Sequence, residues 1–174
     1  MMGFRNRRAD ARSAFRRGSH DKRWRNVLRT SALLIFATAA CSSPPPPPPS
    51  LELTIAAGAD QNPGPSGQPT PVAIRVYQLA ATAAFERADP FALADHDVAT
   101  LGPDDLGGEE FLLAPGETRV VKSPVKQGAQ FIGCIVLFRD IDHATWRTQA
   151  PLKPNGPTKL TLHTAGLVAT LTGG

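Results

Sequence analysis

The chain has 174 residues, with 19 Lys and Arg against 15 Asp and Glu, and a formal net charge of +4. Residues 1–40 hold ten basic and two acidic side chains, so the positive charge belongs to this segment and residues 41–174 are mildly acidic. This distribution excludes a basic patch for phosphates and predicts no nucleic-acid partner. A hydrophobic content of 41% predicts a globular chain, and the 17 Pro and 15 Gly disfavour long helices.

A basic segment precedes about ten apolar residues that end at Ala40. Such a run is too short for a bilayer core, which needs roughly 20 residues, and it is typical of a secretory signal. We therefore expect residues 1–40 to be a signal peptide, and a start site placed upstream of the true one to explain its length. Ala39-Ala40-Cys41 resembles a bacterial lipobox, with Thr38 where an aliphatic residue is usual, so Cys41 is predicted to be acylated. The alternative is an ordinary signal peptide in which Cys41 is incidental.

Residues 41–50 are predicted to be a tether. Its centre is the six-proline run Pro44–Pro49, which favours polyproline II and predicts a semi-rigid spacer of roughly 19 Å. The alternative is a docking motif for a proline-binding domain. Ser42 follows the cysteine, and in lipoproteins a residue other than Asp at that position is compatible with outer-membrane sorting.

Residues 51–174 are predicted to form an all-β domain, a two-sheet β-sandwich of seven or eight short strands. Residues 110–113 and 118–122 are expected to form a hairpin across a type II turn at Ala114–Glu117. Residues 131–138 are apolar throughout, which predicts a central strand buried on both faces. The expected strands, from alternating or continuous apolar patterns, are 51–55, 71–79, 110–113, 118–122, 131–138, 144–150, 158–164 and 167–171.

A short helical insertion is expected after the second strand. Ala80–Ala94 is alanine-rich and interrupted at Pro90, which predicts two short helical turns, with Thr82 capping the first and Asp89 the second. Gly58–Thr70 and Gly102–Gly108 are rich in turn-forming residues and are predicted to be loops.

No catalytic, metal or cofactor site is predicted, apart from the covalent acyl chains on Cys41. Cys134 lies in an apolar strand and is expected to be a buried, inert thiol. His96 lies between two aspartates and His143 follows Asp140 and Asp142, but each group falls short of a metal site and is expected to be a solvated turn. His163 is expected at the surface, and Trp146 is expected to face the core.

Several segments in order resemble the type VI secretion outer-membrane lipoprotein family, TssJ. Together they cover roughly residues 51–165. They are Asn62-Pro63, Gly67–Pro71, Arg75–Leu79, Ala84-Phe85, Asp89–Leu93, Pro115–Thr118, Phe138–Asp142 and Ala144–Arg147.

The resemblance implies a transthyretin-like sandwich without enzymatic activity, lipid-anchored in the outer membrane and facing the periplasm. It also implies that the protein anchors the membrane core complex by binding the periplasmic C-terminal region of the IcmF-like inner-membrane subunit, TssM. The partner-binding residues implied in the first loop are Gln61, Asn62, Pro63, Gly64, Pro65, Ser66, Gly67 and Gln68. Two alternatives remain: a lipid-tethered periplasmic carrier with a sizeable apolar pocket, and an enzyme using Asp140, Asp142 and His143.

Overall fold

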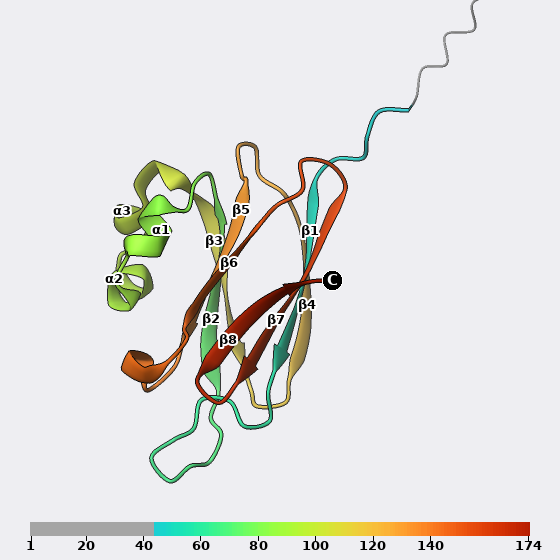
Figure 1. Cartoon of the computed structure of the whole chain (residues 1–174). Coiled ribbons are helices and arrows are strands. Elements are labelled where there is room, and N and C mark those ends of the chain that lie inside the picture. Colours follow the sequence, from blue (N-terminus) through green and yellow to red (C-terminus); the bar gives the residue numbers. More distant parts are fainter. Residues whose placement is uncertain (1–43) are drawn as a thin grey trace, which may run out of the picture. The chain divides into compact units, whose positions relative to one another are not determined.

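The computed structural model describes residues 44–174, which form a β-sandwich of two four-stranded sheets (Figure 1). One sheet has the strand order β4-β1-β7-β8 and the other β3-β2-β5-β6. All neighbouring strands are antiparallel except β1 and β7, which are parallel. The strands are β1 (Ser50–Ala57), β2 (Val72–Leu79), β3 (Asp105–Leu113), β4 (Thr118–Pro124), β5 (Phe131–Leu137), β6 (Arg147–Pro151), β7 (Pro157–Ala165) and β8 (Val168–Gly173). The predicted two-sheet sandwich is confirmed, with eight strands.

The space between the sheets is filled by the alternate residues of each strand. In β1 the side chains of Leu51, Leu53 and Ile55 are buried, while those between them are half-exposed. Leu160 and Leu162 of β7 point into the same core, as their alternation predicts. Burying such a side chain contributes about 1.5–3 kcal/mol, so the period-two pattern of these strands determines which face turns inward.

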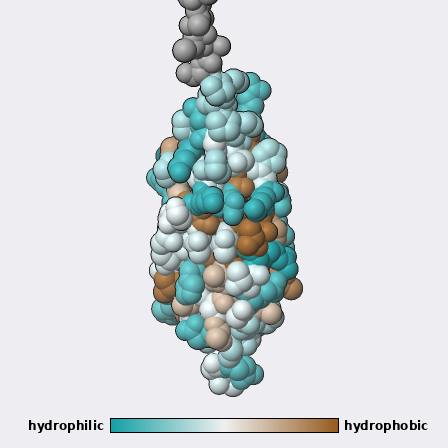
Figure 2. Space-filling model, turned by 90° about the vertical axis from the view of Figure 1, so that its right-hand side faces the viewer, coloured by the Kyte–Doolittle hydropathy of each residue, from teal (hydrophilic) through white to brown (hydrophobic). Residues whose placement is uncertain are grey.

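The outer face of the β4-β1-β7-β8 sheet is open to solvent. Figure 2 faces this side, where hydrophobic side chains appear as small brown areas among teal and white ones. The outward residues of β7 include Lys159 and His163, both exposed, which confirms the surface position expected for His163. Apart from the parallel β1–β7 pair this sheet is antiparallel, and antiparallel sheets commonly have one solvated face.

A helical insertion between β2 and β3 covers the outer face of the other sheet (Figure 1). In α2 the Asp89 carboxylate accepts hydrogen bonds from the backbone N–H groups of Phe91 and Ala92, and Pro90 occupies the first turn. The expected Asp89 cap is therefore confirmed, whereas Thr82 makes no capping hydrogen bond and that expectation was wrong. The insertion comprises α1 (Ala83–Arg87), α2 (Pro90–Asp95), α3 (Asp97–Leu101) and the 3₁₀ turn η1 (Gly102–Asp104).

The insertion and the sheet enclose a second core. Phe85, Leu93 and Leu101 of the helices pack against apolar side chains of β2 and β5. Gly133 on β5 makes this possible, because a Cβ there would lie 2.9 Å from the ring of Phe85. Tyr77 lies within this core, donates its hydroxyl to the carbonyl of Leu93 and has its pKa raised to about 12, chiefly by burial.

Arg147 at the start of β6 fastens the insertion to the sheet. Its guanidinium donates to the carbonyl oxygens of Phe85 (2.7 Å) and Ala88 (3.1 Å) at the end of α1. It also lies 4.7 Å from the ring centroid of Trp146. Trp146 itself is half-buried and packs against both cores just before β6, so its expected inward orientation is met only in part.

β5 and the second half of β2 (Val76–Leu79) are consequently buried on both faces, and in β5 the prediction for residues 131–138 is confirmed. Cys134 is fully buried in this strand and is the free cysteine among residues 44–174. Burial raises the pKa of its thiol to about 12, which keeps the thiol protonated and unreactive at neutral pH.

Two expectations about the chain between the sheets were wrong. The turn at Ala114–Glu117 exists, with Gly116 at φ +78°, but the strands on either side do not form a hairpin. β3 pairs with β2, whereas β4 pairs with β1 in the opposite sheet, so the turn carries the chain across the sandwich. Residues 102–108, expected to be a loop, contain η1 and the first four residues of β3.

The polyproline tether is partly docked on the domain. The carbonyl of Pro47 accepts a hydrogen bond from Gly156, and that of Pro49 accepts one from Val125. Pro44–Pro48 are exposed. The freely extended spacer is therefore shorter than the expected six prolines, because its second half forms a strap against the loops that follow β4 and β6.

This strap predicts a measurable difference between the two halves of the proline run. Replacing Pro47–Pro49 by Gly-Ser-Gly keeps the accepting carbonyls but raises the entropic cost of docking. We expect the amide hydrogens of Gly156 and Val125 to exchange several-fold faster in this variant. Replacing Pro44–Pro46 by the same residues is the matched control, and equal exchange in the two variants would show that the strap is not docked in solution.

Candidate functional site

The candidate site is the long β1–β2 loop, at the end of the sandwich opposite the proline strap (Figure 1). Its tip is a tight turn, in which Gly67 donates to the carbonyl of Gly64 and Gly64 donates to that of Gln68. Gly67 has φ +82°, a conformation in which glycine carries no steric penalty. The exposed residues of the loop tip are Pro65, Ser66, Gly67, Gln68 and Pro69.

The root of the loop is held by Gln61, whose side chain is fully buried. Its amide nitrogen donates to the carbonyl of Leu113 (3.0 Å), and its amide oxygen accepts from the hydroxyl of Thr164 (2.6 Å). One side chain thus connects the loop to the last residue of β3 and to β7. Because a buried amide without partners costs free energy, these bonds fix the position of the loop root.

Asn62 is the second root residue, with an exposed fraction of 2%. Its side-chain nitrogen donates to the carbonyl of Pro71, and its side-chain oxygen accepts from the backbone N–H of Arg139, both at 2.8 Å. The hydroxyl of Thr70 donates to its backbone carbonyl. Asn62 therefore joins both ends of the loop to the segment that follows β5.

Of the eight predicted contact residues, Gln61 and Asn62 offer almost no surface to a partner in this structure. Pro63 and Gly64 are half-exposed, and the residues from Pro65 to Gln68 are exposed. The burial of Gln61 and Asn62 depends on partners distant in sequence, for which the local sequence carries no signal. The part of the loop available for contact is accordingly residues 63–69.

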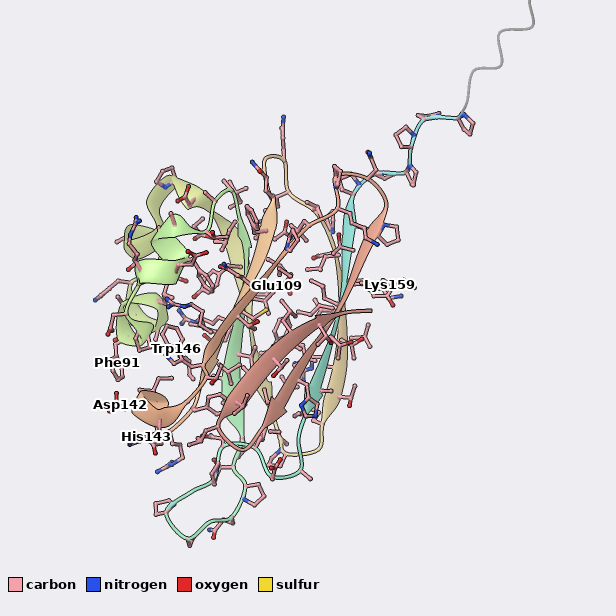
Figure 3. The ribbon with its side chains drawn as sticks, viewed as in Figure 1. Phe91, Glu109, Asp142, His143, Trp146 and Lys159 are labelled. Atoms are coloured by element: carbon pink, nitrogen blue, oxygen red, sulfur yellow. The ribbon has the colours of Figure 1, made fainter. Side chains whose placement is uncertain are left out.

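The turn after β5 lies at the same end of the sandwich and carries several charged side chains. It contains the 3₁₀ turn η2 (Ile141–His143), and Figure 3 labels Asp142 and His143 pointing outward from it. Nδ1 of His143 lies 2.8 Å from the carboxylate of Asp140, and this hydrogen bond raises the pKa of the imidazole. Within residues 44–174, no three His, Cys, Asp or Glu side chains are grouped to hold a metal ion.

His96 does not join this group. It separates α2 from α3 on the helical insertion, where neighbouring Asp97 pairs with Arg75 at 3.5 Å. Arg75 also pairs with Glu110 of β3. The pair with Asp97 holds the insertion against the sheet, whereas the pair with Glu110 links the neighbouring strands β2 and β3 within the sheet.

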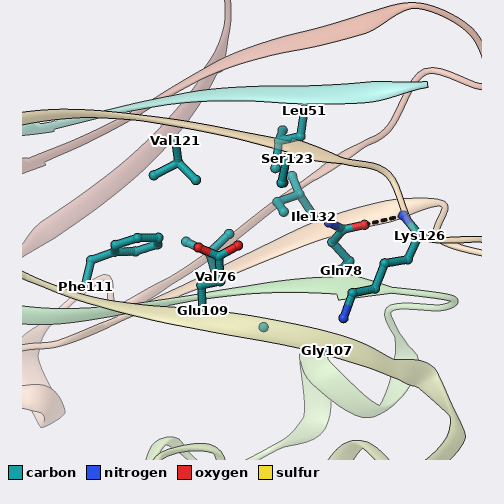
Figure 4. Close-up of a pocket in the computed structure, with 11 residues that line it drawn as sticks. Leu51, Val76, Gln78, Gly107, Glu109, Phe111, Val121, Ser123, Lys126 and Ile132 are labelled. Carbon is teal, nitrogen blue, oxygen red and sulfur yellow. Dashed lines mark hydrogen bonds between the residues drawn. The ribbon is translucent and has the colours of Figure 1, made fainter. Parts of the chain in front are cut away.

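The opening between the sheets, at the edge formed by β3 and β4, is shown in Figure 4. Phe111 and Val121 line it, and Gln78 accepts a hydrogen bond across it from the backbone N–H of Lys126. Its volume is about 40 Å³, whereas small-ligand pockets measure roughly 300–1,000 Å³. This opening is too small for the ligand that the carrier interpretation expects. Two larger hollows, of about 410 and 430 Å³, lie outside this opening, one beside α2, α3 and β3 and the other beside the β6–β7 connection.

The buried amide of Gln61 leads to a prediction for stability. Gln61→Ala leaves the Thr164 hydroxyl and the Leu113 carbonyl without their partner, and we expect a loss of about 1–3 kcal/mol in the free energy of unfolding. The control is Gln68→Ala at the exposed tip, which should change it by less than about 0.5 kcal/mol. Denaturant unfolding of both variants measures the difference, and equal values would contradict the role given to Gln61.

Comparison with known proteins identifies the family. The family model described as type VI secretion lipoprotein, VasD, EvfM, TssJ, VC_A0113 matches residues 49–166. No curated protein sequence matches the chain. None of the helices in residues 44–174 is long and apolar enough to cross a bilayer.

Solved structures agree with the family match. The lipoprotein TssJ1 of Pseudomonas aeruginosa is 32% identical with a TM-score of 0.71, over 74% of this chain and 98% of that one. Serratia marcescens Lip, a membrane-bound component of the type VI secretion system, is 27% identical with a TM-score of 0.66, over 73% and 98%. A chain in a structure named for the TssM C-terminal domain (869-1107) from EAEC is 31% identical with a TM-score of 0.61, over 70% and 99%. The chain therefore belongs to the type VI secretion lipoprotein family that includes TssJ.

Proposed function

We propose that this protein anchors the membrane core complex of a type VI secretion system at the outer membrane. Acyl chains on Cys41 hold it in the membrane, and its domain faces the periplasm and binds the periplasmic C-terminal region of the IcmF-like inner-membrane subunit, TssM. The observation that carries the proposal is the exposed loop tip, held on a rigid root at the end of the sandwich opposite the tether. The proposal includes no catalytic step and no cofactor.

The anchor rests on the sequence, because Cys41 lies outside the described residues. Each buried CH₂ of an acyl chain contributes about 0.8 kcal/mol, and two or more chains give stable anchoring. Pro47, where the strap meets the domain, is six residues from Cys41. We propose residues 1–40 as the signal peptide, 41–50 as the tether and 51–174 as the functional domain.

The choice of TssM as partner is supported by the third solved structure. The match uses 70% of this 174-residue chain and covers 99% of the matched chain. The matched chain is therefore much shorter than the TssM fragment, whose name gives the span 869-1107. We infer that the matched chain is a second component of that structure, solved together with the TssM domain. A relative of this protein found with the TssM C-terminal domain supports the same pairing here.

The loop has the physical properties of a docking element. Pro63, Pro65 and Pro69 reduce the number of conformations that it would lose on binding. Its tip is exposed, whereas its root is fixed by buried amides, so the contact residues project from a rigid scaffold. We propose residues 63–68 as the contact residues, with Gln61 and Asn62 holding them in place.

A binding titration between the purified lipoprotein and the periplasmic region of the IcmF-like subunit from the same genome tests the role. We expect saturable one-to-one binding, weakened at least about tenfold when residues 64–68 are replaced by Gly and Ser, because the fixed loop shape is lost. The matched control replaces Gln127 and Gln130, exposed polar residues at the opposite end, by Ser. Unchanged affinity in the loop variant would move the site elsewhere, and no binding by folded wild-type protein would refute the role.

The anchor has its own test in cells. Fatty acid carrying a label should enter the wild-type protein and should be absent from Cys41→Ser, because acylation needs the thiol. Cys134→Ser is the matched control and should retain the label, since that thiol is fully buried. Label that persists in Cys41→Ser would refute acylation at this residue.

A further inference from the structure

The β1–β2 loop and the turn after β5 are far apart in sequence but are directly connected in the structure. The backbone N–H of Arg139 donates to the side-chain oxygen of Asn62 at 2.8 Å, across 77 residues. The same side chain donates to the carbonyl of Pro71. One buried amide therefore fixes the turn at residues 139–143 relative to both ends of the loop.

Asn62 has a left-handed backbone conformation, which asparagine adopts more often than most other non-glycine residues. Its φ of +48° is the one positive value among non-glycine residues in 44–174. A residue in a sparsely populated conformation persists where its surroundings over-determine it, and such positions cluster at ligand clamps and binding sites. Its backbone N–H is also used, donating to the carbonyl of Gly166 between β7 and β8. Asn62 thus holds together several connections at this end of the sandwich.

The two connected segments differ in chemistry. The loop contains no charged side chain from Gln61 to its end at Thr70, so its tip can supply shape and amide contacts but no charge. The turn adds the exposed carboxylates of Asp140 and Asp142 beside the exposed guanidinium of Arg139. Asp140 is paired with His143, whereas Asp142 takes part in no ion pair recorded for residues 44–174. Charges at the margin of an interface mainly set the association rate and the orientation of the partner.

We propose that the turn at 139–143 is the second half of the docking surface, the first half being the tip of the β1–β2 loop. Asn62 is the positioning residue that fixes the two halves relative to each other. The carboxylates of Asp140 and Asp142 receive lysine or arginine side chains of the partner, while the loop tip makes the uncharged contacts. This inference rests on the proposed function, since the partner is the same periplasmic domain of the IcmF-like subunit.

Hydrogen exchange on the full-length lipoprotein in detergent, with and without that domain, maps the contact. We expect slower amide exchange on binding at Gly64 and at residues 66–68 of the loop, and also in residues 139–145. Protection of the loop alone would overturn the assignment of residues 139–143 to the docking surface and leave the anchor role intact. No binding by the wild-type protein would overturn both proposals.

Charge substitutions test the chemistry of the turn. The double variant of Asp140→Asn and Asp142→Asn should associate about threefold to tenfold more slowly, and its rate should fall less steeply with salt. The matched control removes the same charge with Asp95→Asn in α2 and Glu109→Gln in β3, both exposed, and should associate within about twofold of the wild type. Equal rates for the two double variants would overturn the assignment of the carboxylates.

Asn62→Gly tests the positioning role. Glycine adopts the positive φ without strain, so this variant removes the side-chain bonds and keeps the backbone path. We expect faster amide exchange at Arg139 and a dissociation rate about five to ten times higher, because the halves no longer bind as one surface. Thr158→Ala controls for lost stability, since its buried hydroxyl accepts from Lys153 at the opposite end. A dissociation rate for Asn62→Gly equal to that of Thr158→Ala would overturn the positioning role.

Discussion

The burial of β5 and of the second half of β2 on both faces is the constraint on which the rest of the structure depends. Their inner faces form the sandwich core, and their outer faces carry Tyr77, Leu79 and Ile135, which water would otherwise cover. The helical insertion meets this requirement, and Gly133 gives Phe85 the room to pack there. With one sheet covered by helices and the core filled, the connections at the two ends of the sandwich remain available for recognition. One end receives the proline strap, and the other carries the loop and the charged turn.

The loop end is organised by polar rather than apolar burial. The side chains of Gln61 and Asn62 lose their hydrogen bonds to water on folding. Hydrogen bonds to segments distant in sequence replace them. Apolar packing tolerates many arrangements of similar volume, whereas a buried amide accepts only those in which its donors and acceptors are paired. The two amides therefore specify the direction in which the loop leaves the domain. A docking element benefits from this, since flexibility at its root would raise the entropic cost of binding.

The sequence predicted the strands well because their periodicity reflects burial, which is a local pattern of the chain. It failed where the outcome depends on distant partners. The turn at Ala114–Glu117 was correctly located, but turn chemistry alone does not determine whether the flanking strands pair with each other or with β1 and β2. Gly107 and Gly108 suggested a loop, yet pairing with β2 makes them strand. The resemblance implied that Gln61 contacts the partner, and only the positions of Leu113 and Thr164 reveal its burial. The resemblance in ordered segments identified the family, which no single motif could do.

Strand β1 connects the tether directly to the β1–β2 loop, so a force on one is transmitted to the other. The strap ends at Pro49, β1 runs from Ser50 to Ala57, and the loop begins at Gly58. β1 is an inner strand, paired along its length with β4 on one side and β7 on the other. In the proposed role, a pull between the acyl chains and a partner on the loop acts along this strand. Such a pull is borne by the covalent backbone of β1. The hydrogen bonds to β4, which lie across the strand, and the slanted bonds to β7 hold that strand in its sheet. Gln61 and Asn62 then pass the load to β7, to β3 and to the turn after β5, so the pull is shared by both sheets.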